Sequence, residues 1–139
     1  MARLAHFFHL RQPWTAGAPL PGGDFMHDGA GALIARAMRT WPFLSESHAT
    51  RLVRAYGTRI ERVLGAARTA DEVGPWLGAD LTGAEVRYLM AHEWAQTEDD
   101  VLWRRSKLGL RFQTAEREAL GRFMADAVGA SGHPLSPAG

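Results

Sequence analysis

The sequence predicts an all-α fold, a single compact helical domain of about six short helices in an irregular, orthogonal bundle. Apolar residues recur at spacings of three and four along most of the chain, which is the helical pattern. No stretch alternates with a period of two in β-branched residues, so no strand is predicted. The 139 residues, 46% of them apolar, suffice for one hydrophobic core.

Proline and glycine divide the chain. Residues 12–24, "QPWTAGAPLPGGD", contain three prolines and three glycines and cannot form regular structure. We expect a Pro/Gly-rich segment at 14–24, the helical domain at 25–129 and a flexible tail at 130–139, with residues 1–13 as a segment set apart by the resemblance given below.

Three helices are predicted in the first half of the helical domain. The first ends before Pro42, and its apolar stripe consists of Leu33, Ile34, Ala37, Met38 and Trp41. The second has a stripe of Leu52, Val53 and Tyr56, and the third has a stripe of Ile60, Val63 and Leu64. Each of these two is followed by a glycine suited to a left-handed C-terminal cap, Gly57 and Gly65.

Helix starts in the second half are predicted from Thr or Ser followed by an acid three residues later. Two such capping boxes are Thr69 with Glu72 and Thr82 with Glu85, and Thr97 with Asp100 begins a further helix. The last helix is expected to be capped by Thr114 and to turn four residues inward, namely Leu120, Phe123, Met124 and Val128.

Composition argues against several classes of function. Sixteen basic and fifteen acidic side chains leave a net charge of +1, which disfavours a general nucleic-acid binder. The lack of cysteine removes thiol chemistry and disulfides and fits a cytoplasmic location. No apolar run approaches the ~20 residues of a membrane span, and the pattern of the first ten residues is not the one expected of a signal peptide.

No catalytic, cofactor-binding or metal site is predicted. "GAGALI" at 29–34 begins like a dinucleotide fingerprint, but Ile34 replaces the third glycine and no strand precedes it. "HEWAQ" at 92–96 begins like a zinc-protease helix, but Gln96 replaces the second histidine. No serine lies in a nucleophile-elbow sequence.

The charged run "DDVLWRRSKLGLR" at 99–111 allows two interpretations. In a helix over 98–108, Arg105 would emerge from the apolar side, and Glu93 would do so on the preceding helix, so we predict a partly buried Glu93–Arg105 salt bridge. Asp100 and Arg104 are expected to form an i, i+4 surface pair. The alternative is an anion cradle for a phosphate, a lipid head group or an RNA backbone, which neighbouring acids disfavour; its residues would be Arg104, Arg105, Lys107 and Arg111.

Three stretches resemble the C-terminal helical domain of the FAD-dependent glycerol-3-phosphate dehydrogenases of the aerobic, respiratory type. They are "WTAGAPLPGGDF" at 14–25, "YGTRIERVL" at 56–64 and "AEVRYLMAHEWAQTEDDVLWRRSKLGL" at 84–110, and the resemblance covers about residues 14–128. It implies a parent enzyme whose preceding domain holds FAD, oxidises sn-glycerol 3-phosphate to dihydroxyacetone phosphate and passes electrons to quinone at the inner face of the cytoplasmic membrane. Residues 1–13 do not resemble the end of that flavin domain.

The resemblance implies that this chain, which lacks the flavin and substrate domain, is not an enzyme by itself. We expect a structural or interaction domain that packs against the FAD-binding domain and could self-associate through an exposed apolar face. The residues expected to serve internal ion pairs or docking are Glu85, Tyr88, Glu93, Asp100, Arg104 and Arg105. Arg104 and Arg105 are the candidates to face the missing domain. Two alternatives stay open: a free-standing helical adaptor that binds an acidic partner through residues 104–111, and a basic cluster that reaches the substrate site of the intact enzyme.

Overall fold

The computed structural model describes residues 29–131. It contains α2 (Gly29–Thr40), α3 (Glu46–Tyr56), α4 (Ile60–Leu64), α5 (Gly83–His92) and α6 (Thr114–Ser131), with a hairpin of β1 (Trp76–Gly78) and β2 (Leu81–Thr82). The mostly helical fold is confirmed, with five α-helices among the described residues instead of about six. The expectations for segments 1–13 and 14–24 and for most of the tail lie outside the described residues.

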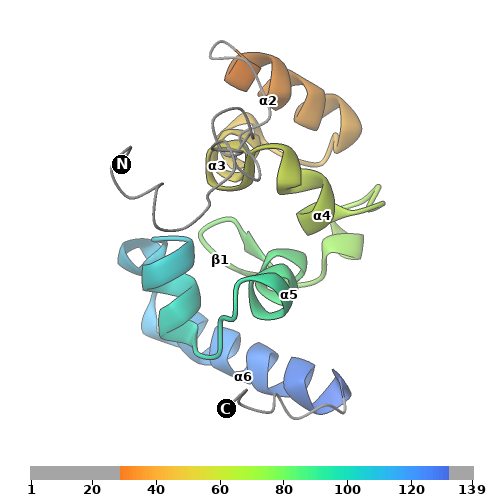
Figure 1. Ribbon diagram of the computed structural model, residues 1–139. Coiled ribbons are helices and arrows are strands. Elements are labelled where there is room, and N and C mark those ends of the chain that lie inside the picture. Colours follow the sequence, from red (N-terminus) through yellow and green to blue (C-terminus); the bar gives the residue numbers. More distant parts are fainter. Residues whose placement is uncertain (1–28, 132–139) are drawn as a thin grey trace, which may run out of the picture.

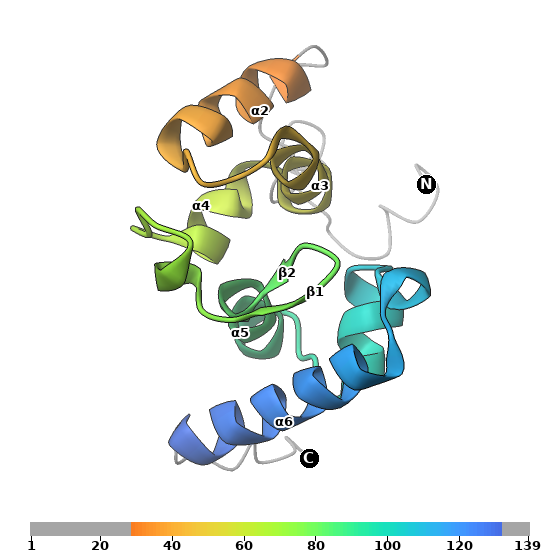
Figure 2. The same cartoon turned by 180° about the vertical axis from the view of Figure 1, so that it is seen from behind.

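The helices follow one another through the molecule (Figures 1 and 2). Helix α2 lies at one end and α6 at the other, with α3, α4, the hairpin and α5 between them. One core runs through these elements and includes Ala37 of α2, Leu52 of α3, Leu89 of α5 and Leu120 of α6. No helix of the described part is both long enough and apolar enough to cross a membrane.

The predicted helix ends in the first half are present. Helix α2 stops at Thr40, two residues before Pro42, as expected from a residue that cannot continue a helix. Gly57 follows α3 with φ 54° and Gly65 follows α4 with φ 57°. These are left-handed conformations that glycine adopts without steric cost, which explains why both stops were visible in the sequence.

The hairpin corrects the expectation of a fold without strands. It pairs Gly78 with Leu81 in antiparallel fashion, and the intervening Ala79 and Asp80 have φ 43° and 69°. Positive φ at both central residues is typical of the type I′ turn. Strands of three and two residues are too short to show an alternating pattern, and Ala-Asp is not the usual sequence of such a turn.

Two further boundaries differ from the prediction. The box of Thr69 and Glu72 begins only a 3₁₀ turn, Asp71–Val73, not a helix. Helix α6 begins at Thr114 itself, with the backbone N–H of Gln113 donating to Glu116 Oε2 at 2.7 Å, and it continues past Gly129. Leu120 and Met124 are buried as expected, but Val128 is 49% exposed because the far end of α6 extends beyond the core.

Candidate functional site

A buried ion pair joins α3 to α5. Arg51 donates from Nη1 to Glu85 Oε1 at 2.8 Å and from Nη2 to Glu85 Oε2 at 2.7 Å. The Glu85 side chain is fully buried and that of Arg51 is 16% exposed. Two parallel bonds between a guanidinium and a carboxylate fix orientation as well as distance. The pair therefore sets how α3 and α5 lie against each other.

Two more hydrogen bonds extend this pair, one from Tyr56 of α3 and one to the turn of the hairpin. Tyr56 donates its hydroxyl to Glu85 Oε1 at 2.8 Å, and Arg51 Nη2 donates to the backbone oxygen of Asp80 at 2.8 Å. Burial and the adjacent Glu85 carboxylate raise the pKa of Tyr56, which keeps the hydroxyl protonated as a donor. We call these residues, Arg51, Tyr56, Glu85 and the Asp80 carbonyl, the ion-pair cluster.

The imidazole ring of His48 lies close to the ion-pair cluster, while its backbone N–H donates to Ser45 Oγ at 3.2 Å. The residue is 1% exposed, and neither ring nitrogen has a hydrogen-bond partner among residues 29–131. Its ring packs edge-on against Trp76 at 5.2 Å between centroids. Burial, followed by the positive charge of Arg51, lowers the pKa of His48. The side chain therefore behaves as a neutral aromatic residue that fills space between α3 and β1.

Glu85 and Tyr88 are buried within the core, but the partners of Glu85 were missed. Tyr88 packs edge-on against Tyr56 at 5.5 Å between ring centroids. The backbone N–H of Glu85 donates to Thr82 Oγ1 at 3.4 Å, yet the Glu85 carboxylate turns away from the cap toward Arg51, so the predicted capping box is only half formed. The spacing of four residues between Glu85 and the core residue Leu89 is the signal that could have placed this acid inside.

The local contacts around Asp100 are present. Arg104 donates to Asp100 Oδ1 at 2.8 Å as the predicted i, i+4 pair. Asp100 Oδ2 accepts from the backbone N–H groups of Gln96 and Thr97 at 3.0 and 3.1 Å, and Thr97 Oγ1 accepts from the Asp100 N–H at 3.2 Å. The bond from Gln96 contributes most to lowering the pKa of the Asp100 carboxyl. The capping box of Thr97 and Asp100 is therefore complete.

The predicted salt bridge between Glu93 and Arg105 is wrong. Arg105 is exposed, Glu93 is half-buried, and neither forms an ion pair within residues 29–131. The reason is that Asp100–Arg105 form a π-helix, in which each turn holds an extra residue. Ser106, not Arg105, returns to Val101, donating to its carbonyl from N at 2.9 Å and from Oγ at 2.7 Å. Arg105 is thereby turned away from the core.

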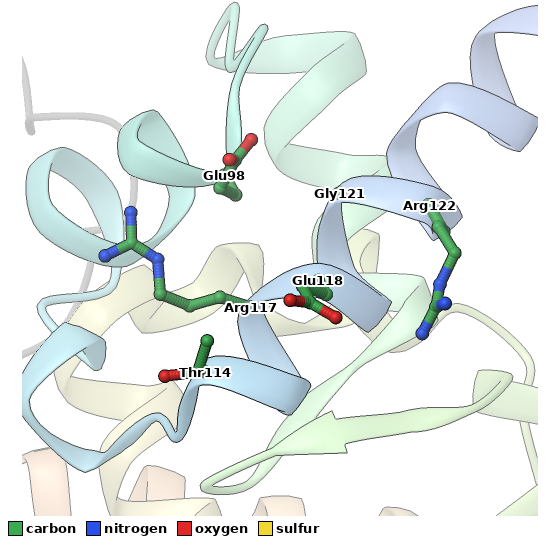
Figure 3. A pocket seen from close by; sticks show the side chains of 6 residues that line it. All are labelled: Glu98, Thr114, Arg117, Glu118, Gly121 and Arg122. Carbon is green, nitrogen blue, oxygen red and sulfur yellow. The ribbon is translucent and has the colours of Figure 1, made fainter.

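A cavity of about 550 Å³ beside α6 does not form a convergent site. Its lining includes two acids and two arginines, Glu98, Glu118, Arg117 and Arg122. Figure 3 shows the Arg117 and Arg122 side chains extending in different directions on either side of Glu118. Arg117 is already bonded to Asp99. Because the opposite charges cancel and the side chains point in different directions, we interpret this surface as a solvated helix face and not as a ligand site.

Large apolar side chains are exposed around the π-helix. Trp94, between α5 and the π-helix, is 81% exposed, and Trp103 and Leu110 are also exposed. Trp94 has φ 58°, a left-handed conformation that is rare for a bulky residue. The Leu89 carbonyl accepts from both the Glu93 and Ala95 N–H groups, which holds the chain in this bend. An exposed tryptophan on constrained backbone is typical of a contact surface.

The described residues do not match the requirements of a dinucleotide or a metal. FAD-binding folds place the phosphates at a glycine-rich turn between a parallel strand and a helix. The sheet of residues 29–131 is a single antiparallel hairpin without such a turn. No group of three His, Asp or Glu side chains within that same range is arranged to hold a metal ion. The geometry thus defines a helical domain whose polar cluster serves packing.

The family follows from comparison with known proteins. Residues 13–131 match the family described as the C-terminal domain of alpha-glycerophosphate oxidase. The chain belongs to this family, which confirms the resemblance drawn from the sequence.

Named relatives include oxidoreductases acting on different polyol phosphates. The chain is 40% identical over 138 residues to a glycerol-3-phosphate dehydrogenase of Pseudomonas aeruginosa, covering 99% of this chain and 26% of the relative. It is 38% identical over 120 residues to D-erythritol 1-phosphate dehydrogenase of Brucella abortus, covering 86% and 24%. It is 36% identical over 113 residues to the aerobic glycerol-3-phosphate dehydrogenase of Escherichia coli, covering 81% and 22%.

The chain spans about a quarter of the length of these relatives. It corresponds to a C-terminal domain of the larger enzymes. The alignment with the Pseudomonas aeruginosa protein also extends into residues 1–13, the segment that the sequence set apart from the family.

Proposed function

We propose that this chain is a non-catalytic C-terminal structural and interaction domain of an FAD-dependent dehydrogenase that oxidises sn-glycerol 3-phosphate to dihydroxyacetone phosphate. The single observation that carries the proposal is the match to one quarter of each relative, combined with a polar cluster devoted to internal packing. The flavin, the substrate site and electron transfer at the inner face of the cytoplasmic membrane are assigned to the other three quarters of such an enzyme.

Similarity across relatives supports a role common to different substrates. The chain is 40% identical to a relative named for glycerol 3-phosphate and 38% identical to one named for D-erythritol 1-phosphate. A domain that chose between these polyols would be expected to diverge with the substrate. A domain that only packs against a shared flavin-binding part is not expected to diverge with the substrate.

The exposed tryptophan supports docking onto that flavin-binding part. Trp94 presents a large apolar surface on backbone that is held in place by α5. Tryptophan is among the residues that contribute most to binding at protein interfaces. Arg104, on the π-helix that follows Trp94, is exposed although paired with Asp100, and would add a charged contact.

The experiment mixes the 139-residue chain with the Pseudomonas aeruginosa relative shortened by its matching quarter. Sedimentation velocity is expected to show a 1:1 complex, and the relative's own C-terminal quarter serves as the positive control. Association of that control but not of this chain would contradict docking onto a shared surface. Self-association of this chain alone would show that the apolar surface pairs with a second copy instead.

The adaptor alternative is weakened within residues 104–111. Arg104 is paired with Asp100, and Arg111 lies 3.7 Å from Asp80, so half of the four cations in this segment already have acidic partners. An adaptor would bind an acidic peptide and remain indifferent to the flavin-binding part in the same sedimentation experiment.

A further inference from the structure

A cleft of about 460 Å³ lies between α3 and the end of the π-helix. Helix α3 contributes Ser47, Thr50, Arg51 and Arg54, and the other wall is formed by Arg105, Ser106 and Lys107. The π-helix directs Arg105 away from the core, and the structure places it instead in the lining of this cleft. The feature that overturned the predicted salt bridge therefore supplies one wall of the cleft.

The charge of this cleft is positive, and three of its four cations have no acidic partner among the described residues. Its lining holds four cationic side chains and, among the described residues, no carboxylate. Of these cations, Arg51 is paired with Glu85. Arg54, Arg105 and Lys107 are exposed and form no ion pair within residues 29–131. Cations that share one concave surface repel each other unless an anion lies between them.

The donors in the cleft suit a tetrahedral oxyanion. Guanidinium groups bind phosphate through pairs of N–H donors, and a lysine adds a mobile point charge. The hydroxyl group of Thr50 is a further donor on the same helix, and that of Ser47 lies in the same lining but already shares a hydrogen bond with Ser45 Oγ at 3.0 Å. Lys107 has φ 58°, and its position is fixed by neighbouring contacts, with Leu108 N donating to Ser106 Oγ at 3.4 Å. A tetrahedral dianion can accept hydrogen bonds from donors on several sides at once, whereas a planar carboxylate accepts them in one plane.

We propose that this cleft binds a phosphate group, carried either by a small soluble phosphate ester or by a lipid head group. Its volume is many times the roughly 30 Å³ that one water molecule occupies in the liquid, which leaves space for part of the ester beyond the phosphate. The site lies wholly within this chain and does not depend on docking to a flavin-binding part.

The first test is an NMR titration of the 139-residue chain at constant ionic strength. The probes are inorganic phosphate and sn-glycerol 3-phosphate, with glycerol as the uncharged control. Saturable shifts of the backbone amides of Thr50, Arg54, Ser106 and Lys107 are expected with both phosphates and not with glycerol. Shifts that grow without saturation and spread over arginines throughout the chain would overturn the proposal for soluble esters.

The second test is the double variant Arg105→Gln with Lys107→Gln. Both replacements remove the positive charge and keep a shorter, unbranched polar side chain, and they add no new backbone demand at position 107. Loss of two charge-assisted contacts is expected to weaken phosphate binding at least about tenfold. Arg122→Gln, which removes an exposed cation on α6, is the matched control and should bind as the unmodified chain does. Equal affinity of the double variant and this control would overturn the proposal.

Vesicles distinguish the two sources of phosphate. Co-sedimentation with vesicles of phosphatidylglycerol in phosphatidylcholine, lost in the double variant and absent with phosphatidylcholine alone, would support a lipid head group. Binding of soluble ester without vesicle binding would support a free phosphate ester. Binding of neither, or preference for a polyglutamate peptide over both, would overturn the proposal.

Discussion

Glu85 is the side chain on which the packing of α3, α5 and the hairpin depends most. It is fully buried and accepts hydrogen bonds from Arg51 and Tyr56. A buried ion pair adds little net stability relative to apolar residues, because both charges lose their hydration. Removing one partner is different, since the other charge is then left buried and uncompensated.

Glu85→Gln is therefore expected to lower the free energy of unfolding by about 3 kcal/mol. Glutamine still accepts a bond from Tyr56 but no longer balances Arg51. Glu61→Gln is the matched control, because it breaks the Arg36–Glu61 pair, whose side chains are both more than half exposed, and should cost under about 1 kcal/mol. Urea denaturation of both variants measures the difference. Equal losses would contradict a structural role for the buried pair.

His48 predicts a specific dependence of stability on pH. Burial holds the pKa of His48 below the 6.5 of an unperturbed histidine, so the unfolded chain binds the proton first. Stability linked to neutral His48 is complete above about pH 6.5 and is lost as the pH falls toward the folded-state pKa.

His48→Phe removes this titration and keeps an aromatic ring against Trp76. The free energy of unfolding, measured by urea denaturation between pH 7.5 and pH 5, should decline less for the variant than for the unmodified chain. The other histidines are common to both proteins and cancel in the comparison. Parallel pH profiles would show that His48 already takes up a proton in the folded state.

Helix ends, rather than helix partners, were predictable from the sequence. Proline, glycine and capping residues act on the backbone within a few positions, so the stops at Pro42, Gly57 and Gly65 and the box at Thr97 were visible. The contact of Arg51 with Glu85 spans 34 positions and has no local signal. For that reason Glu85 was expected to serve an ion pair or docking without a named partner, and Arg51 was missed.

The π-helix explains the remaining error among the elements. Assigning faces with 3.6 residues per turn placed Arg105 on the apolar side, whereas an i to i+5 bond from Ser106 to Val101 shifts it outward. Periodicity alone cannot detect one inserted residue in so short a helix. The same shift places Arg105 in the cleft against α3.

The 3₁₀ turn Gly109–Arg111, which follows the π-helix, depends on a close approach between Gly109 and Trp103. A Cβ atom at position 109 would lie 2.5 Å from the indole ring. Gly109→Ala is expected to lower the free energy of unfolding by about 1–3 kcal/mol, because the ring must move. Gly121→Ala on α6 is the control, since its Cβ would meet nothing closer than 3.8 Å. It should leave stability unchanged or raise it by about 0.5–1 kcal/mol. Denaturation followed by tryptophan fluorescence checks both, and an unaffected Gly109→Ala chain would contradict the packing.

For the molecule as a whole, the sequence predicts the fold class but not which side chains form the exposed surface. Its mostly helical class and its family were accessible from the sequence, because periodicity and motif order extend along the chain. The exposure of Trp94 could not be predicted from the sequence, because whether a side chain is exposed depends on which helices pack against each other. That surface is the part of the molecule relevant to docking.

Trp94→Gly separates docking from folding. Glycine fits φ 58° and the exposed ring contributes little to the core, so the free energy of unfolding should stay within about 1 kcal/mol. Affinity for the flavin-binding part should fall about 30-fold, the effect of losing ~2 kcal/mol at an interface tryptophan. Met38→Ala, on α2 at the other end of the molecule from α6, is the control (Figure 1). If the glycine variant binds with unchanged affinity, Trp94 is not part of the interface.

A chimera examines the proposed role within a complete enzyme. The matching quarter of the Pseudomonas aeruginosa glycerol-3-phosphate dehydrogenase is replaced by this chain, and KM for sn-glycerol 3-phosphate is measured on the purified protein. We predict an active enzyme whose KM stays within about twofold of the relative's, a difference of less than ~0.5 kcal/mol in binding. A folded, flavin-loaded chimera with KM changed tenfold or more would contradict a non-catalytic domain, because this chain would then take part in substrate recognition.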